Sequence, residues 1–202
     1  MNARCNQSVS SAMFTMQLIV SLLFISAFCP VTSISQTLPS DRNPKLNSTI
    51  NPKFNSTINP KFNSSINPKF NSTINPKFNS TINPKFNSSI NPKFNSTINP
   101  KFNSTINPKF NSAINPKYSS SIKGFYYFNL NGELRGLLIR ANKNVFVMFD
   151  GDLDWSGYAV SNKDGGYNLF DLDGEWVGYF LDNSADNFNL FTLEGNWIGF
   201  TT

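Results

Sequence analysis

The hydrophobic pattern changes twice along the chain. Residues 18–31 are largely apolar. Residues 43–122 carry an apolar side chain at every fourth position, because ten octads of the type NPKFNSTI follow one another without a gap. In residues 123–202 apolar and aromatic side chains gather in short runs that recur every 21 residues. These changes predict a signal peptide over residues 1–35, a linker over residues 36–42, an octapeptide block and a C-terminal domain.

The 21-residue repeat of the C-terminal domain predicts four β-hairpins. A glycine recurs at this spacing, with a Phe eight residues before it and an aromatic residue or Leu directly after it. The four glycines are Gly136, Gly157, Gly178 and Gly199. In one unit, residues 167–181, Asp173-Gly174 separates two runs of β-forming residues, which favours a type I′ turn. Two further units carry this signal, at Asn131-Gly132 and Glu194-Gly195. In the second unit Asp150-Gly151 falls two residues early, so we expect a reshaped turn there.

The four hairpins are expected to close into a ring. Isolated hairpins are marginally stable and must pack on one another. The sequence ends three residues after Gly199 without a capping element, and ring closure removes the need for one. We therefore predict an all-β domain of four hairpins with pseudo-fourfold symmetry. Within a hairpin we expect Val177 and Tyr179 on one face. Trp176 and Gly178 fall on the other face, where the glycine marks a close backbone approach or a bulge.

The octads predict turns but leave two arrangements open. Asn followed by Pro favours a type I turn, and Pro at every eighth position excludes a long helix. In the first arrangement the block is a disordered or turn-rich stalk, because two large apolar side chains per octad leave little area to offset the entropy of ordering. In the second, N-P-K forms a corner and F-N-S-T-I a strand of a narrow β-roll, with Phe, Ser and Ile pointing inward. The unvarying serine of the octads supports the β-roll, and the stalk is the leading interpretation.

The apolar N-terminal stretch indicates export. Its fourteen residues are fewer than a transmembrane helix needs, and Arg4 is the only charge before it. Cleavage is predicted after Ser33 or Ser35. It would remove Cys5 and Cys29 and leave no thiol chemistry and no stable membrane span. An uncleaved signal anchor is the alternative. The predicted localisation is secreted, extracellular or cell-surface.

Charge is segregated between the two repeat regions. Each octad has one Lys and no acid, whereas residues 123–202 hold eleven acids and five bases, a net charge of −6. Evenly spaced single lysines without a recognisable module argue against a nucleic-acid partner. The chain has no His and both Cys precede the predicted cleavage site, which excludes the usual catalytic triads and transition-metal sites. We therefore expect a non-enzymatic protein without catalytic residues, metal or cofactor.

Aromatic side chains are the candidate ligand-binding groups. Trp155, Trp176 and Trp197 precede the recurring glycine by two residues, and Tyr158 and Tyr179 follow it directly. Exposed aromatic faces bind sugar rings and cationic groups, although packing within the ring is an alternative role for them.

The acidic residues give weaker signals. Asp150, Asp152 and Asp154 alternate as in a calcium loop, but the twelfth position of such a loop, which requires Glu, is Ser161. Most acids of the C-terminal domain fall at hairpin turns, where solvated turn chemistry explains them better than a carboxylate pair for glycoside hydrolysis.

The octads also contain eight N-S-T or N-S-S sequons. In a eukaryotic secretory pathway their asparagines would be glycosylation sites. They are Asn47, Asn55, Asn63, Asn71, Asn79, Asn87, Asn95 and Asn103.

Two resemblances bear on the C-terminal domain. The units YNLFDLDGEWVGYF and FNLFTLEGNWIGF resemble the hairpins of the bacterial four-fold β-flower domain. This resemblance covers residues 123–202 and implies a four-petalled ring of aromatic and glycine-rich hairpins, but it implies little about activity. Residues 125–136 are also similar to the choline- or glucan-binding repeats of cell-wall proteins. Those repeats open with Trp, where this chain has Phe125, Phe146, Tyr167 and Phe188.

These observations favour a secreted or surface-displayed protein in which a repetitive spacer presents a β-hairpin module. The expected partner of the module is a glycan or a cell-envelope polymer. In the alternative, the protein is a structural matrix or coat component and the octads are the functional element. Deletion of residues 43–122 distinguishes the two, because a binding module would keep its ligand and a structural polymer would lose its assembly.

Overall fold

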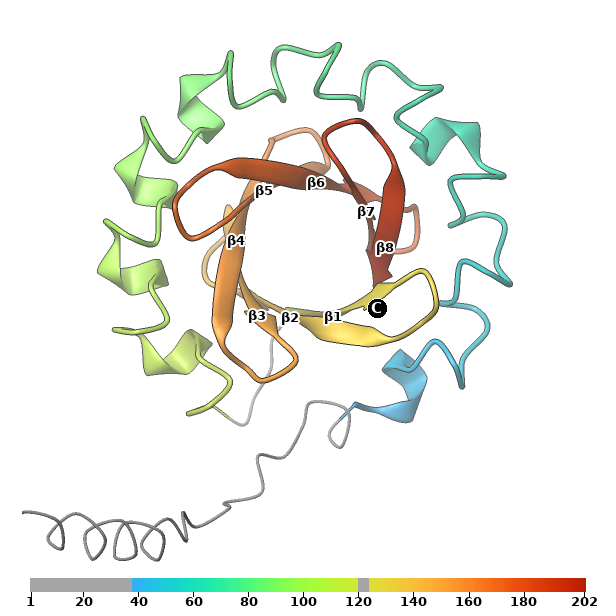
Figure 1. The fold of residues 1–202 in the computed structure, drawn as a ribbon, viewed down its shortest axis with the longest axis horizontal. Helices are drawn as coiled ribbons and strands as arrows, with labels where there is room; N and C mark the ends of the chain where they lie inside the picture. The colour runs from blue at the N-terminus through green and yellow to red at the C-terminus, as the bar shows by residue number, and fades with distance from the viewer. Residues whose placement is uncertain (1–37, 120–123) are drawn as a thin grey trace, which may run out of the picture. The chain divides into compact units, whose positions relative to one another are not determined.

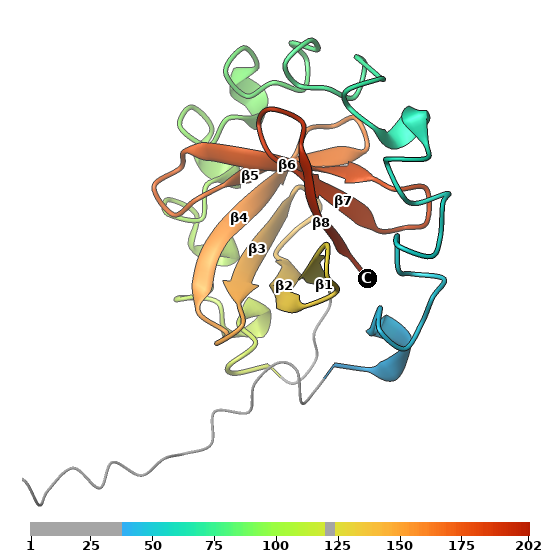
Figure 2. The same cartoon turned by 45° about the vertical axis from the view of Figure 1, so that its right-hand side comes forward.

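The computed structural model describes residues 38–119 and 124–202. The predicted signal peptide lies outside these residues. Eight antiparallel strands close into a barrel, which confirms the predicted all-β domain of four hairpins (Figure 1). The octads, residues 43–119 of the described chain, wrap around the outside of the barrel, and we call them the girdle (Figures 1 and 2). In the described part of the chain no helix has the length and apolar character needed to cross a membrane.

Each hairpin pairs with both of its neighbours, so the barrel has no free strand edge. The strands are β1 (Gly124–Asn129), β2 (Leu134–Arg140), β3 (Val145–Asp150), β4 (Trp155–Ser161), β5 (Gly166–Phe170), β6 (Trp176–Asp182), β7 (Phe188–Phe191) and β8 (Trp197–Thr201). The ring closes between β8 and β1, where Tyr127 pairs with Thr201 and Phe128 pairs with Phe200.

A β-bulge precedes the recurring glycine in every hairpin. In the third hairpin Leu169 pairs with Gly178 and Phe170 pairs with Trp176, so Val177 is the extra residue. The same shift occurs in the other three hairpins. The bulge brings the indole of Trp176 onto the outer wall of the barrel, in the same apolar cluster as Tyr179, and leaves Val177 exposed. The predicted face of Trp176 is therefore wrong, because one extra residue reverses the alternation of side chains.

The recurring glycine cannot be replaced by a larger residue, because the backbone of the neighbouring hairpin lies too close to it. A Cβ on Gly178 would lie 2.7 Å from the carbonyl oxygen of Phe191, and a Cβ on Gly136 would lie 1.9 Å from that of Phe149. Both distances are shorter than non-bonded atoms allow. The structure thus shows both features expected at this position, a bulge and a close backbone approach.

The four hairpin turns share one geometry. Gly132, Gly174 and Gly195 have left-handed φ values of +72°, +82° and +79°, and the residue before each of them does not. Each turn is therefore a type I turn followed by a left-handed residue, and the predicted type I′ turns are wrong. In the second hairpin Leu153 takes the left-handed position with a φ of +63°, so this turn is not reshaped as expected. Asp150 Oδ1 holds it by accepting hydrogen bonds from the backbone N–H groups two and four residues later.

The interior of the barrel is filled with side chains. Phe125, Phe146, Tyr167 and Phe188, one from each hairpin, contact one another edge to face in a closed cycle, with ring centroids 4.9 to 5.6 Å apart. Because each contact skips a strand, the cycle lies inside the barrel. Aromatic pairs of this kind add stability beyond the area that they bury. The same cluster contains the buried side chains of Leu138, Phe146, Met148, Ala159, Phe180 and Leu190.

The outer wall of the barrel is apolar as well. Aromatic side chains stack where neighbouring hairpins meet. Tyr158 stacks on Phe170 and Tyr179 stacks on Phe191, with ring centroids 5.6 and 5.7 Å apart. All four are at most 2% exposed. The two-sided burial means that the barrel needs a cover on its outside.

Each of the first nine octads of the girdle folds into two Asx-type turns. In residues 75–82, Asn75 Oδ1 accepts a hydrogen bond from the backbone N–H of Lys77 at 2.9 Å, and Asn79 Oδ1 accepts one from that of Thr81 at 3.0 Å. The turn-rich character expected of the octads is thus confirmed. Several second halves form a single 3₁₀ turn, as does the segment before the girdle. These turns are η1 (Ser40–Arg42), η2 (Ser64–Ile66), η3 (Ser88–Ile90), η4 (Ser96–Ile98), η5 (Ser104–Ile106) and η6 (Ser112–Ile114).

Asparagine amides link each octad to the one before it. Asn83 Nδ2 donates to the carbonyl oxygen of Pro76 at 2.8 Å, and Asn79 Nδ2 donates to that of Thr73 at 2.6 Å. The same pair of bonds recurs along the girdle. Buried amides are therefore paired, as buried polar groups must be, and this explains why both asparagines recur in almost every octad.

The octads turn isoleucine towards the barrel and phenylalanine away from it. Ile58, Ile82 and Ile106 are 1% to 2% exposed, whereas Phe62 and Phe86 are each 75% exposed. The girdle is therefore neither an extended stalk nor a β-roll with Phe inside. The wall of the barrel supplies the apolar contact area that the octads lack on their own, which the octad sequence could not reveal.

Three octads match one hairpin. Asn168 Nδ2 donates to the carbonyl oxygen of Ile82 and Asn189 Nδ2 to that of Ile58, both at 2.9 Å. The two isoleucines are 24 residues apart, which is three octads, and the two asparagines are 21 residues apart, which is one hairpin. The girdle thus runs around the barrel in the opposite sense to the hairpins (Figure 1). At this ratio a full circle would hold twelve octads, and the sequence has ten.

The substitution Ile82→Ala is expected to lower the free energy of unfolding by about 3 kcal/mol, because it opens a cavity between the girdle and the barrel. The matched control is Phe86→Ala, whose side chain points outward and whose expected effect is below about 0.5 kcal/mol. Urea denaturation of the two variants measures the difference. Equal destabilisation by both variants would contradict the inward orientation of isoleucine.

Candidate functional site

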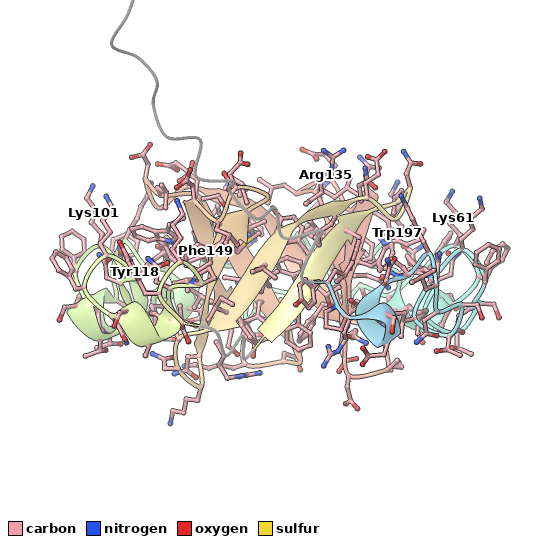
Figure 3. All side chains as sticks on the ribbon, turned by 90° about the horizontal axis from the view of Figure 1, so that it is seen from below. Lys61, Lys101, Tyr118, Arg135, Phe149 and Trp197 are labelled. Carbon is pink, nitrogen blue, oxygen red and sulfur yellow. The ribbon has the colours of Figure 1, made fainter. Side chains whose placement is uncertain are left out.

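The tryptophans stand at one edge of the outer wall, beside the girdle. Trp155, Trp176 and Trp197 each begin the second strand of a hairpin, directly after its turn, and each is half-buried. The bulge aims each indole outward. Figure 3 shows Trp197 beside the girdle, on the same side of the barrel as Lys61. Each indole faces two consecutive octads, and together they form what we call an indole cleft.

Two indole clefts are built from equivalent residues. Each has a volume of about 240 Å³. Cleft 176 is lined by Pro84, Lys85, Asn91, Lys93, Phe170, Gly174, Glu175 and Trp176. Cleft 197 is lined by Pro60, Lys61, Asn67, Lys69, Phe191, Gly195, Asn196 and Trp197. Equivalent girdle residues of the two clefts are 24 positions apart in the sequence, and equivalent barrel residues are 21 positions apart. Since three octads cover one hairpin, the same site is formed again at the next hairpin.

The two lysines of these clefts recur beside Trp155 in the second hairpin. The ammonium group of Lys109 lies 6.0 Å from the centroid of the Trp155 ring. Lys117 Nζ donates a hydrogen bond to the carboxylate of Asp154. Lys109 and Lys117 follow Lys85 and Lys93 by 24 residues. Each tryptophan therefore lies beside two lysines of the girdle, and we call this third copy cleft 155.

One lysine of each cleft is held by the hairpin and the other is free. The held pairs are Lys69 with Asn196, Lys93 with Glu175 and Lys117 with Asp154. The hydrogen bond to Asp154 raises the pKa of Lys117 above its ordinary value. The other three, Lys61, Lys85 and Lys109, form no ion pair or hydrogen bond with another described residue, and the ammonium group of Lys109 lies near the Trp155 ring. Since Asn196 carries no charge, cleft 197 has the largest positive charge of the three.

The three indoles are not held alike. Trp155 Nε1 donates to the carbonyl oxygen of Gly157 at 2.9 Å, and Trp197 Nε1 donates to that of Gly199 at 2.7 Å. Trp176 Nε1 is buried and has no hydrogen-bond partner among the described residues. An unpaired buried N–H is costly, so Trp176 is held less firmly than the other two indoles.

The two tyrosines predicted as ligand contacts lie behind the clefts. Tyr158 and Tyr179 are 2% and 1% exposed. A Cβ on Gly174 would lie 3.4 Å from the hydroxyl of Tyr158, and one on Gly195 would lie 3.4 Å from that of Tyr179. Burial raises the pKa of both phenols well above its ordinary value. The tyrosines therefore support the turns that line the clefts, and in this state a ligand would not touch them.

The other sequence candidates have local structural roles. Asp150 holds its turn by accepting backbone hydrogen bonds, and no group of three or more potential metal ligands occurs among the described residues. Seven of the eight sequon asparagines use their amide groups to link octads, as Asn79 does with Thr73, and Asn47 donates to the carbonyl oxygen of Asp41. A glycan on such an amide would remove one of its two N–H groups.

Comparisons with protein-family models, curated proteins and solved structures find no match for this chain. The site is therefore interpreted from its geometry alone. The sequence identified the tryptophans as candidates but missed the lysines, asparagines and prolines of the girdle. The sequence held one usable signal, the two repeat lengths. If three octads of eight residues cover one hairpin of 21 residues, a lysine of every third octad lies beside the turn of each successive hairpin.

Proposed function

We propose that the protein is a non-enzymatic, secreted or surface-displayed module that binds a glycan of a cell envelope through its indole clefts. The observation that supports this proposal is the recurrence of one cleft, with an indole, two lysines and an asparagine, at two hairpins, and of the indole with two lysines at a third. An indole face packs on the C–H face of a sugar, while amide and ammonium groups bind its hydroxyl or carboxylate oxygens. Repeated sites on one ring also favour a polymer, since each further contact is intramolecular.

The octads take part in this proposed function and do not act as a spacer. They contribute the proline, asparagine and both lysines of each cleft. Removing them would remove half of the site, so a deletion of residues 43–122 would not separate a binding role from a structural one. Substitutions within the clefts are the appropriate test.

The intrinsic fluorescence of the protein can report on the clefts, because all three tryptophans of the chain lie in them. We expect a polysaccharide that binds to shift the tryptophan emission and to protect it from acrylamide. Suitable probes are chitooligosaccharides, soluble β-glucan and soluble peptidoglycan fragments. Trp176→Ala should weaken the binding of a responsive probe by about tenfold, as the loss of a central aromatic contact does.

The matched control for Trp176→Ala is Val177→Ala, which changes the exposed neighbouring residue on the bulge. It should leave the affinity unchanged. If no probe changes the emission, or if both substitutions weaken binding equally, the proposed role of the clefts is wrong.

A further inference from the structure

Every octad of the girdle turns its fourth side chain outward. These ten side chains are 68% to 77% exposed. They are Leu46, Phe54, Phe62, Phe70, Phe78, Phe86, Phe94, Phe102, Phe110 and Tyr118. Scattered exposed apolar residues need no explanation, but an unbroken series of exposed aromatic residues marks an interaction surface. We call these side chains, together with the lysine before each of them, the girdle rim.

The girdle rim is positively charged along its whole length. The girdle contains ten lysines and no acid. Only three girdle lysines, those held by the hairpins, form a hydrogen bond or ion pair with another side chain of the described residues. The ammonium groups of Lys53 and Lys77 lie 5.9 Å from the ring centroids of Phe54 and Phe78. Figure 3 shows Lys61 and Lys101, on opposite sides of the barrel, pointing to the same side of the girdle.

Shallow grooves separate successive outward side chains. One groove of about 450 Å³ is lined by Phe62 together with nearby serine, threonine and asparagine residues of two octads. An equivalent groove of about 420 Å³ lies at Phe110, six octads further along. Each groove therefore combines an aromatic ring, hydroxyl groups and an amide. No lysine lines either groove, and the lysines of the rim add positive charge along the same arc. The groups in the groove suit the ring and hydroxyls of a sugar unit, and the nearby lysine charge suits a carboxylate on it.

We propose that the girdle rim binds an acidic polysaccharide that follows the arc of the girdle. Such a polymer is flexible and has the same group at every unit, so it can meet the same lysine and aromatic ring at every octad. Its negative charge complements a surface that has ten lysines and no acid. A nucleic acid fits less well, because the girdle has no arginine and its lysines are single and evenly spaced, without a recognisable nucleic-acid-binding module. This inference goes beyond the indole clefts, since it depends on the outward rings and on lysines such as Lys77 and Lys101, which line no indole cleft.

The test uses polygalacturonate as the acidic probe and dextran of similar length as the neutral one, with affinities for the full chain measured at low and high NaCl. The rim variant combines Lys77→Gln, Phe78→Ser, Lys101→Gln and Phe102→Ser, none of which lines an indole cleft. Its control carries the same types of change on exposed positions of the barrel. The control combines Arg135→Gln, Lys143→Gln, Leu172→Ser and Val177→Ser.

We expect the wild-type chain and the control to bind polygalacturonate with equal affinity, and the rim variant to bind it at least about tenfold more weakly at low salt. Binding should weaken as the salt concentration rises, and dextran should not bind. Because the substituted rings are 69% and 68% exposed, the rim variant should unfold at the same temperature as the wild type. Equal affinity of rim variant and control, equal binding of dextran, or tighter binding of single-stranded DNA of the same total charge would overturn the proposal.

The result is separable from that of the indole clefts. Trp176→Ala leaves the rim intact, so it should bind polygalacturonate as the wild type does. A loss of polygalacturonate binding in Trp176→Ala together with normal binding by the rim variant would assign the acidic ligand to the clefts and overturn the role of the rim.

Discussion

Removal of the girdle, residues 43–119, is expected to abolish the soluble folded barrel. The outer wall of the barrel carries stacked aromatic pairs such as Tyr158 with Phe170 and Tyr179 with Phe191, which the girdle keeps at most 2% exposed. Fully burying such a side chain contributes about 1.5 to 3 kcal/mol, so exposing the whole wall exceeds the stability of an ordinary domain. The measurements are the soluble yield of residues 124–202 and its amide dispersion in a heteronuclear NMR spectrum.

The octads supplied as a separate chain should restore the soluble barrel. The contacts between them are non-covalent, including the hydrogen bonds from Asn168 to Ile82 and from Asn189 to Ile58. A control chain in which Ile58, Ile82 and Ile106 are replaced by Ser should not rescue it. A monomeric barrel with well-dispersed amides in the absence of any octad would instead support the spacer interpretation.

Deletion of half an octad is expected to cost far more than deletion of a whole one. Loss of residues 75–82 lets the preceding octads move up by one place, where nearly identical residues meet the same wall, so only one octad of contact is lost. Loss of residues 79–82 alone shifts the octads before the deletion by four residues relative to the barrel wall. Phe54 and Phe62 would then face the barrel in place of isoleucine, or the segment would loop out.

Thermal unfolding measures this difference. We expect the four-residue deletion to lower the unfolding midpoint by at least about 10 °C, and the eight-residue deletion by less than half of that, given about 2 to 4 °C per kcal/mol for a chain of this length. Deleting residues 51–58 instead of residues 75–82 should give the same small change, because any whole octad is equivalent. Similar midpoints for the four- and eight-residue deletions would contradict the inward and outward assignment of Ile and Phe.

The sequence was sufficient to predict the barrel because its signals are local and repeated. The 21-residue spacing of Gly136, Gly157, Gly178 and Gly199 gave four hairpins, and the marginal stability of an isolated hairpin gave the closed ring. The glycine also predicted a bulge. The face on which each tryptophan lies depends on where the extra residue of the bulge is inserted. The pattern of apolar and polar residues does not show this position, so the predicted face of the tryptophan was wrong. Leu153 was missed for a similar reason, since a left-handed Leu has no sequence signal.

The girdle could not be predicted from the octads because its stability lies in another part of the chain. An octad contains one inward apolar side chain, which is too few for a core of its own. Its partner surface is formed only after four hairpins have closed, and residues such as Asn168 show no sign in the sequence that they bind a carbonyl group 86 positions earlier. The same holds for the clefts, since each of them combines residues that lie far apart in the sequence.

The match of three octads to one hairpin also has a consequence for how the chain folds. Octads are nearly interchangeable, so the wall of the barrel cannot tell one octad from the next, and the girdle could dock in several places shifted by eight residues. The features that distinguish these places are at the ends of the girdle: residues 120–123 connect it to β1, and Thr202 Oγ1 donates to the carbonyl oxygen of Arg42 at 2.7 Å. To reach its native position, the girdle must therefore select among several docked positions on the barrel that have nearly the same energy. Lengthening the connection to β1 should slow the final phase of refolding without changing the rate at which the hairpins form.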